Sequence, residues 1–161
     1  MRRNDIEVPA RYYTRLIEML ELSGLNVQPL LARARISLST LQNPDVLLRY
    51  SQVERLITLV REASGLSDLG FELGRTLTMS THSMVGFGML SSANMEQSLQ
   101  FVARFFRLVM PSFGMCYTKG QNQAAIDFFP LIGMGPHSLS FHIEAIATAA
   151  QGRRFQEARE G

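Results

Sequence analysis

The longest apolar segment of the chain, GFGMLSSANMEQSLQFVARFFRLVM at residues 86–110, limits what the protein can fold into. A membrane span needs about 18 or more consecutive apolar residues, and polar side chains interrupt this segment. They recur every three or four residues and so form one narrow stripe on a helix: Glu96, Gln97, Gln100, Arg104 and Arg107. A helix that is apolar on its other sides is typical of a protein core. The segment therefore predicts the central helix of a globular domain.

Composition bounds the class of protein. The 161 residues are enough for one domain with a hydrophobic core. A net charge of +2 is too small to indicate nucleic-acid binding by itself. The single cysteine, Cys116, excludes an internal disulfide framework, and the basic N-terminal residues lack the apolar segment of a signal peptide. We therefore expect a cytoplasmic protein without a membrane segment.

Most of the remaining sequence predicts helices. Pro9 suits a first helical turn, and SQVE at Ser51–Glu54 has the pattern of a capping box that opens a helix ending at Gly65. The last helix is expected after Gly135, and its predicted inward residues are Leu139, Ile143, Ile146 and Ala150. The other predicted helices have the sequences ARYYTRLIEMLELSG, NVQPLLARARI, SLSTLQN and SDLGFELGR.

The apolar period changes after Pro111. The segments FGMCYTK and QAAIDFF alternate at every second residue and flank KGQN, which predicts a β-hairpin. Met115 and Tyr117 would share one face of the first strand, and Ile126 and Phe128 would share a face of the second. We therefore predict an α+β fold, a predominantly helical single domain over residues 8–161 with a β-hairpin packed on the helices.

Two segments imitate the helix-turn-helix units that read DNA, LLARARISLSTL and REASGLSDLGFELGR. A recognition helix offers Arg, Lys, Asn or Gln to base edges. The second segment offers Asp68, Glu72 and two glycines instead, and the first carries Arg33 and Arg35 ahead of its turn. Packed pairs of helices explain both segments better than DNA binding does.

No enzyme signature is present in the sequence. Cys116 with His82, His137 or His142 has the residue types of a thiol nucleophile and its base, but no local motif surrounds it, and a free cysteine is a common small core residue. His142 shares a helix face with small residues, which favours a hydrogen-bonded histidine at the boundary of the core. We found no metal-ligand spacing and no dinucleotide fingerprint. We expect no catalytic activity, no cofactor and no metal.

Several segments taken in order resemble the N-terminal effector-sensing domain of AraC-type bacterial transcription regulators, in the branch with the so-called arabinose-binding N-terminal domain. They are GLNVQPLLARARISLSTLQNPDVLLRYSQVERLI, ASGLSDLGFELGR, GFGMLSSANMEQSLQFVARFFRLV and the hairpin MCYTKGQNQAAIDFF. The most specific of them, residues 86–108, is a glycine-rich helix, a Ser-Ser joint and a helix of alternating Leu or Phe and Arg. The resemblance implies a small-molecule effector of unknown identity, a cytoplasmic location and a role in homodimerisation.

The sequence departs from that family at its end. Such regulators carry a pair of helix-turn-helix units at the C-terminus, and this chain stops at Gly161 without them. We interpret it as an N-terminal piece of a regulator, or a shortened homologue, which would reach DNA only through the missing domain. The alternative is a free-standing module that binds an apolar molecule or an amphipathic acid and is unrelated to transcription.

The central helix also suggests where an effector would bind. Its apolar residues form two rows on adjacent faces, one with Leu99, Val102, Phe106 and Val109, the other with Phe101, Phe105 and Leu108. One row can pack on the core while the other lines a cavity. We predict a pocket with Arg104 at its mouth to hold an acidic group and with apolar walls from Phe101, Phe105, Met110, Met115, Tyr117 and Phe128. The alternative is that these apolar residues are close-packed core and Arg104 is solvated.

Overall fold

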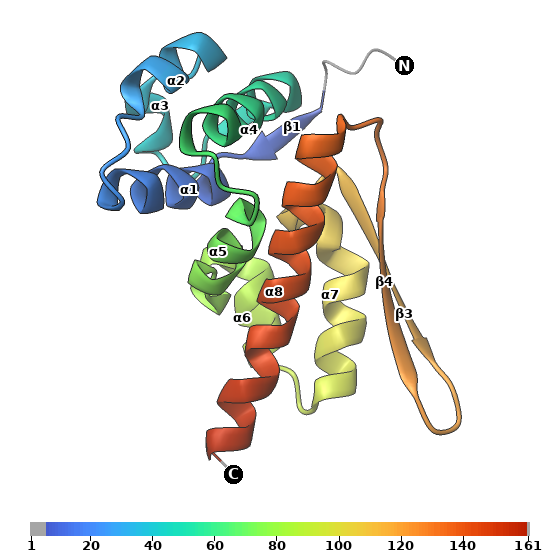
Figure 1. The fold of residues 1–161 in the computed structure, drawn as a ribbon. Helices are drawn as coiled ribbons and strands as arrows, with labels where there is room; N and C mark the ends of the chain where they lie inside the picture. Colours follow the sequence, from blue (N-terminus) through green and yellow to red (C-terminus); the bar gives the residue numbers. More distant parts are fainter. Residues whose placement is uncertain (1–5, 161) are drawn as a thin grey trace.

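The N-terminal part of the fold is a group of four helices joined to a two-stranded sheet. The computed structural model describes the backbone of residues 6–160 and the side chains up to residue 150 (Figure 1). The elements of this part are β1 (Glu7–Pro9), α1 (Arg11–Leu22), α2 (Gln28–Ala34), α3 (Leu38–Leu41), β2 (Leu47–Arg49) and α4 (Tyr50–Ser64). Strands β1 and β2 pair antiparallel, with Val8 opposite Leu48.

The C-terminal part begins after Gly65, which ends α4 with a left-handed backbone (φ 66°). Its elements are α5 (Leu69–Thr76), the 3₁₀ helix η1 (Met79–His82), α6 (Ser83–Leu90), α7 (Met95–Val109), β3 (Phe113–Lys119), β4 (Ala124–Pro130) and α8 (Pro136–Glu160). Figure 1 shows α8 in orange and red running alongside α5, with α7 and the hairpin beyond it. The predicted α+β fold, mainly helical with a hairpin, is confirmed.

The buried residues form two hydrophobic clusters. The first is built from α1, α2 and α4 and includes Leu73 of α5 and Phe141 of α8. The second is built around α7 and includes Val102, Phe106 and Phe113. Helices α1 and α8 contribute to both clusters, because Tyr13 and Phe141 belong to the first and Tyr12 and Ile146 to the second. These two helices therefore join the clusters into one domain.

Glycines in α5 allow α8 to approach closely. A methyl group placed on Gly74 would lie 2.7 Å from the backbone oxygen of Ala145 and 2.6 Å from Cβ of Thr148. Gly70, one turn earlier, faces the backbone oxygen of Phe141 in the same way. Gly70 and Gly74 of REASGLSDLGFELGR thus serve the packing of α5 against α8.

The predicted hairpin is confirmed, with Met115 opposite Phe128 and Tyr117 opposite Ile126. The four side chains are half-buried, while Cys116 on the other face is exposed. The expectation that Cys116 is a small core residue was therefore wrong. The alternating apolar side chains identify the covered face of this hairpin. Cys116 lies between two of them in the sequence and therefore on the opposite, exposed face.

Three local predictions were also wrong. Pro9 lies in β1, and α1 begins at Arg11. Ser51 does not cap α4, which begins at Tyr50; instead Gln52 accepts a hydrogen bond from the Arg49 N–H. Ile143 is 43% exposed, while its neighbours Phe141 and His142 are buried. Helix α8 has apolar residues on several sides, so its sequence did not determine which of them would face α5.

Within the described residues, no helix is both long enough and apolar enough to cross a bilayer. The segment 86–110 is divided between two helices, α6 and α7, and Asn94 caps the second by accepting a hydrogen bond from the Gln97 N–H.

Candidate effector-binding site

A cavity of about 330 Å³ lies between the two hydrophobic clusters, and α1, α5, η1, α6, α7, the hairpin and α8 all contribute to its walls. Its volume is within the range of small-molecule sites. The lining residues are mostly apolar: Tyr12, Tyr13, Leu73, Leu77, Met79, His82, Met89, Met95, Ser98, Leu99, Val102, Phe106, Val109, Met110, Met115, Ile126, Phe128, Phe141, His142, Ala145, Ile146, Ala149 and Ala150.

Carboxylates and Lys or Arg side chains are missing from the described part of this wall. Among the described residues that line the cavity, none is Asp, Glu, Lys or Arg. The polar side chains there are two tyrosines, two histidines and Ser98. The cavity is therefore an apolar space with a few hydrogen-bonding groups.

His142 and Tyr13 form the most deeply buried polar pair of the wall. His142 Nδ1 lies 2.7 Å from the backbone oxygen of Ser138, and because a carbonyl only accepts, Nδ1 carries the proton. Nε2 then accepts the hydrogen bond from Tyr13 Oη, 2.9 Å away. Burial lowers the pKa of His142 from 6.5 to about 4, although the hydrogen bond to Ser138 opposes this. The imidazole is thus neutral at physiological pH.

The same pair belongs to a longer buried network. Tyr50 of α4 contacts Ser138 Oγ at 2.5 Å, and Ser138 Oγ lies 3.3 Å from His142 Nδ1. Burial raises the pKa of Tyr13 well above its ordinary value, with smaller contributions from Tyr50 and Tyr12. The network ties α1, α4 and α8 together next to the cavity.

Tyr12 and His82 form a second polar pair at a more accessible position. Tyr12 Oη lies 3.1 Å from His82 Nδ1, and the ring centroids are 5.8 Å apart. Tyr12 is buried, while His82 is partly exposed. This pair therefore stands at the boundary between the apolar cavity and solvent.

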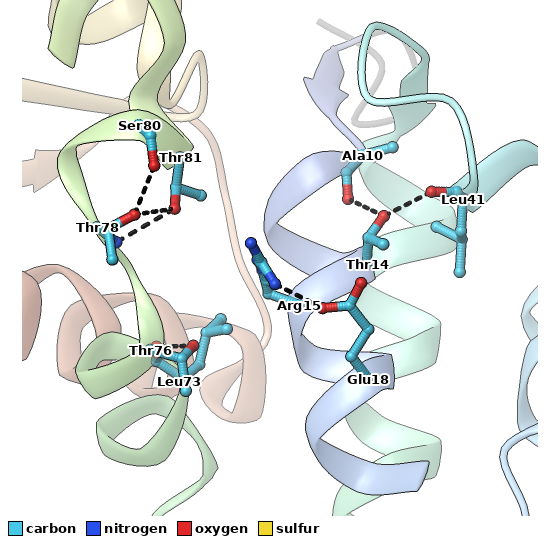
Figure 2. Close-up of polar contacts among 10 residues, drawn as sticks. All are labelled: Ala10, Thr14, Arg15, Glu18, Leu41, Leu73, Thr76, Thr78, Ser80 and Thr81. Atoms are coloured by element: carbon cyan, nitrogen blue, oxygen red, sulfur yellow. Dashed lines mark hydrogen bonds and ion pairs between the residues drawn. The ribbon is translucent and has the colours of Figure 1, made fainter. Parts of the chain in front are cut away.

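Hydroxyl groups hold the turn that carries His82. The N–H of Thr78 donates to Thr81 Oγ1 at 3.1 Å, and the Thr78 hydroxyl lies 2.8 Å from that of Ser80 and 3.2 Å from that of Thr81 (Figure 2). Ser83, which follows His82, has a positive φ of 53°, a backbone conformation that is uncommon outside glycine. The position of His82 is thus determined by a tight, hydroxyl-capped turn.

A polar cleft lies on the other side of this turn. It is lined by Arg11, Thr14 and Arg15 of α1 and by Ser80, Thr81 and Ser83. Figure 2 shows the facing sides of this cleft, with the Arg15–Glu18 ion pair (2.9 Å) on α1 and the Thr78–Thr81 turn opposite. Helix α1 and η1 therefore separate the apolar cavity from a charged surface cleft.

The structure divides the predicted site residues into two groups. Met110, Met115 and Phe128 line the cavity. Phe101, Arg104, Phe105 and Tyr117 are not among its lining residues. The row of α7 that faces the cavity is Leu99, Val102, Phe106 and Val109, which is the row that we expected to pack on the core.

Contacts with α6 explain this orientation. Phe101 lies against Gly88, where an added Cβ would overlap its ring, and Phe101 and Phe105 stack with centroids 4.8 Å apart. Arg104 is exposed, and its guanidinium carbon lies 5.5 Å from the centroid of the Phe105 ring. Arg104 is therefore not at the mouth of the cavity.

Sequence reasoning missed the contribution of α1 and η1. Tyr12, Tyr13 and His82 were not in the predicted site, and His142 was expected only as a hydrogen-bonded residue at the core boundary. The hydrogen bond is confirmed, but His142 is fully buried. Tyr12 and Tyr13 carried a weak signal, because two adjacent tyrosines near the start of an amphipathic helix place one hydroxyl on each side of its buried face.

One of the segments that imitate DNA-reading units, LLARARISLSTL, contains most of α2 and the whole of α3. In LLARARISLSTL, α3 spans only four residues, and the backbone oxygen of Arg35 accepts a hydrogen bond from Gln52 at 2.5 Å.

Within the described residues, no group of three or more His, Cys, Asp or Glu side chains is placed to hold a metal ion. The cavity therefore remains the best-formed candidate for a binding site.

Comparison with known proteins identifies the family. Residues 24–154 match the family described as the arabinose-binding domain of AraC transcription regulators, N-terminal. The ornithine utilization regulator of Pseudomonas aeruginosa is 26% identical over 160 residues. That alignment covers 96% of this chain and 47% of the relative, so the chain spans about half the length of the relative. The chain belongs to the family of N-terminal arabinose-binding domains of AraC transcription regulators, and it is an effector-sensing regulatory domain.

Proposed function

We propose that this domain senses its effector in the cavity between the two hydrophobic clusters. The observation that carries the proposal is that α1 and α8 line the cavity and also join the clusters. A ligand there would contact both halves of the domain at once, so its binding energy would act on their relative packing. The predicted residues Met110, Met115 and Phe128 belong to this site, together with Tyr12, His82 and the inner row of α7.

The name of the family does not define the ligand. A sugar would need many hydrogen-bonding side chains, and the cavity wall offers Ser98 and two Tyr–His pairs, of which Tyr13–His142 is occupied by its own network. We therefore propose an apolar or amphipathic effector. The alternative, a free-standing binding module, would use the same cavity but would not act on transcription.

The whole regulator would bind DNA through a region outside this chain, in the cytoplasm, and would have no enzymatic activity. The family supports the assignment of DNA binding to another region, since the matched model is that of an N-terminal domain. Binding of this chain to the promoter of the neighbouring operon, measured over a salt series, should be weak and lost at higher salt. Sequence-selective binding at physiological salt would contradict the proposal.

We also propose that the domain forms a homodimer, with the segment Leu139–Ala150 of α8 as a contact. Much of this segment is used inside the domain, but Ile143 is 43% exposed. Sedimentation of the chain and of an Ile143→Glu variant tests this. The variant should be more monomeric, and a monomer at high concentration for the unmodified chain would rule the dimer out.

The site itself can be tested by filling the cavity. Val102 is 6% exposed and lines the cavity, whereas Leu108 on the same helix is 69% exposed. Val102→Phe should remove ligand stabilisation, and Leu108→Phe should keep it. At 100 times its Kd a ligand stabilises by about 2.7 kcal/mol, which raises the Tm of a domain of this size by roughly 5–10 °C. Equal responses of both variants would place the site elsewhere.

A further inference from the structure

We propose that Ser98 of α7 is the residue that selects the effector, and that the effector is an apolar molecule with an oxygen function, a hydroxyl or carbonyl group, bonded to the Ser98 hydroxyl. The inference rests on the proposed function, because it assumes that the cavity is the effector site. It names the polar contact that distinguishes one apolar ligand from another of the same size.

Ser98 is a buried polar residue on the apolar inner row of α7. It is 8% exposed and lines the cavity. Met95 and Val102 lie about one turn away from it on either side, and both also line the cavity. The Ser98 side chain therefore lies on the cavity side of the helix.

The hydroxyl of Ser98 has no hydrogen-bond partner among the described residues. A serine inside a helix can bond to the backbone oxygen four residues earlier. Here that oxygen, of Asn94, accepts from the Ser98 N–H at 3.0 Å, and the described residues supply no partner for the Ser98 hydroxyl. A buried hydroxyl without a partner costs free energy. Its position on the wall therefore points to a partner that enters the cavity.

The other polar side chains on the described wall already have partners within the protein. Tyr13 and His142 are hydrogen-bonded at 2.9 Å. Tyr12 and His82 contact each other at 3.1 Å. A ligand would have to compete for any of these four side chains, whereas the Ser98 hydroxyl can both donate and accept without breaking a contact with a described residue.

The rest of the inner row would hold the apolar part of the ligand. Beyond Ser98 the row continues with Val102, Phe106 and Val109, which are buried and line the cavity. At 1.5 Å per residue, Ser98 and Val109 lie about 16 Å apart along the helix. A ligand bonded to Ser98 would lie along these side chains, and burial of its apolar part would supply most of the binding free energy. The hydrogen bond would then set the preference among apolar molecules.

A binding role and a structural role of Ser98 predict different effects on stability. Alanine is a better helix former than serine, and Ser98→Ala removes a buried hydroxyl that has no partner among the described residues. The Tm of the ligand-free variant should therefore be higher than that of the unmodified chain or unchanged within about 3 °C. A larger fall would show that the fold itself needs the hydroxyl, and it would overturn the inference.

The binding experiment compares two ligands of one shape, 1-hexanol and 1-chlorohexane. NMR titration at a single pH gives a Kd for each ligand, and the constant pH keeps the ionisation of His82 the same for both. Ser98→Ala should weaken 1-hexanol by about 2–12-fold, the value of one hydrogen bond, and change the Kd of 1-chlorohexane by less than about 2-fold. Ser51→Ala, at an exposed position outside the cavity, is the matched control and should change neither Kd.

Val102→Phe separates this inference from the proposed function. It should abolish the binding of both ligands, because the larger side chain fills the cavity. If it does so while Ser98→Ala weakens both ligands equally or neither of them, Ser98 does not hold the oxygen and the inference is wrong, although the cavity remains the site. If neither ligand binds the unmodified chain, or if binding survives Val102→Phe, the cavity is not the site and both proposals fail.

Discussion

Tyr13 Oη and His142 Nε2 lie 2.9 Å apart although 129 residues separate them in the sequence. This hydrogen bond joins α1 to α8 inside the wall of the cavity. It is satisfied only while the imidazole is neutral, because a protonated His142 would have no acceptor to offer to Tyr13. The relationship makes the packing of these two helices dependent on pH.

The first prediction follows from the pKa of His142, about 4 in the folded protein against 6.5 in the unfolded chain. The unfolded chain takes up a proton as the pH falls below 6.5 and the folded protein does not until about pH 4. Stability should therefore be complete above pH 6.5 and fall by about 1.4 kcal/mol per pH unit between these values, roughly 3 kcal/mol in all.

Urea unfolding at pH 7.5, 6 and 5 measures this effect. His142→Gln keeps a neutral group that can accept from Tyr13 and donate to Ser138, and it should be less stable than the unmodified protein at pH 7.5 but lose less stability on acidification. If the free energy of unfolding falls by the same amount in both proteins between pH 7.5 and pH 5, His142 is not the titrating group.

The second prediction concerns the contact between α5 and α8. Alanine is a better helix former than glycine by about 1 kcal/mol, so Gly74→Ala would stabilise an exposed helix. Here the added methyl group meets the backbone oxygen of Ala145, and we expect a loss of about 1–3 kcal/mol instead. Phe71→Ala, on the exposed side of α5, is the control and should change stability less. A gain of stability in Gly74→Ala would mean that α8 is not held so close.

A third prediction concerns Glu54, which accepts a hydrogen bond of 2.6 Å from the Gly135 N–H ahead of α8. Glu54→Ala should destabilise the domain by about 1–3 kcal/mol, because it leaves this partly buried donor without an acceptor. Glu54→Gln keeps an acceptor and should recover part of the loss. Glu62→Ala, at an exposed position of α4, controls for loss of charge, and an equal effect of both alanine variants would contradict the assignment.

The fourth prediction is for Arg104→Ala. The side chain is exposed and contacts the face of Phe105, so its loss should cost no more than about 1 kcal/mol. It should also leave ligand stabilisation unchanged, in contrast to Val102→Phe. Loss of ligand stabilisation in Arg104→Ala, measured by thermal shift, would support Arg104 as the residue that holds an acidic group of the ligand.

The spacing of apolar residues predicted the helices of this fold but not which side of each helix faces the cavity. The spacing of Leu99, Val102 and Phe106 predicted a helix that is apolar on adjacent faces, and α7 has that form. Which row would face the cavity depended on Gly88, since its missing side chain leaves room for Phe101 against α6. A single sequence shows the period of such rows and not the neighbour that each row will meet.

The parts that sequence reasoning missed are long-range contacts. Strands β1 and β2 have three residues each and pair across 40 positions, so neither has a period that can be recognised. The cavity combines Tyr12 and His82 with residues of α7 and α8, and no local motif links these segments. The hairpin, in contrast, was predictable because its strands are close in sequence and alternate clearly.

Helix α8 lines the cavity through the part from Phe141 to Ala150 and continues to Glu160. At 1.5 Å per residue, the section from Ile146 to Glu160 is about 21 Å long. A tilt of about 5° around Ile146 would move the far end by about 2 Å, by the same helix geometry. A change in the width of the cavity that tilts α8 would therefore displace the far end of the helix more than the cavity wall itself.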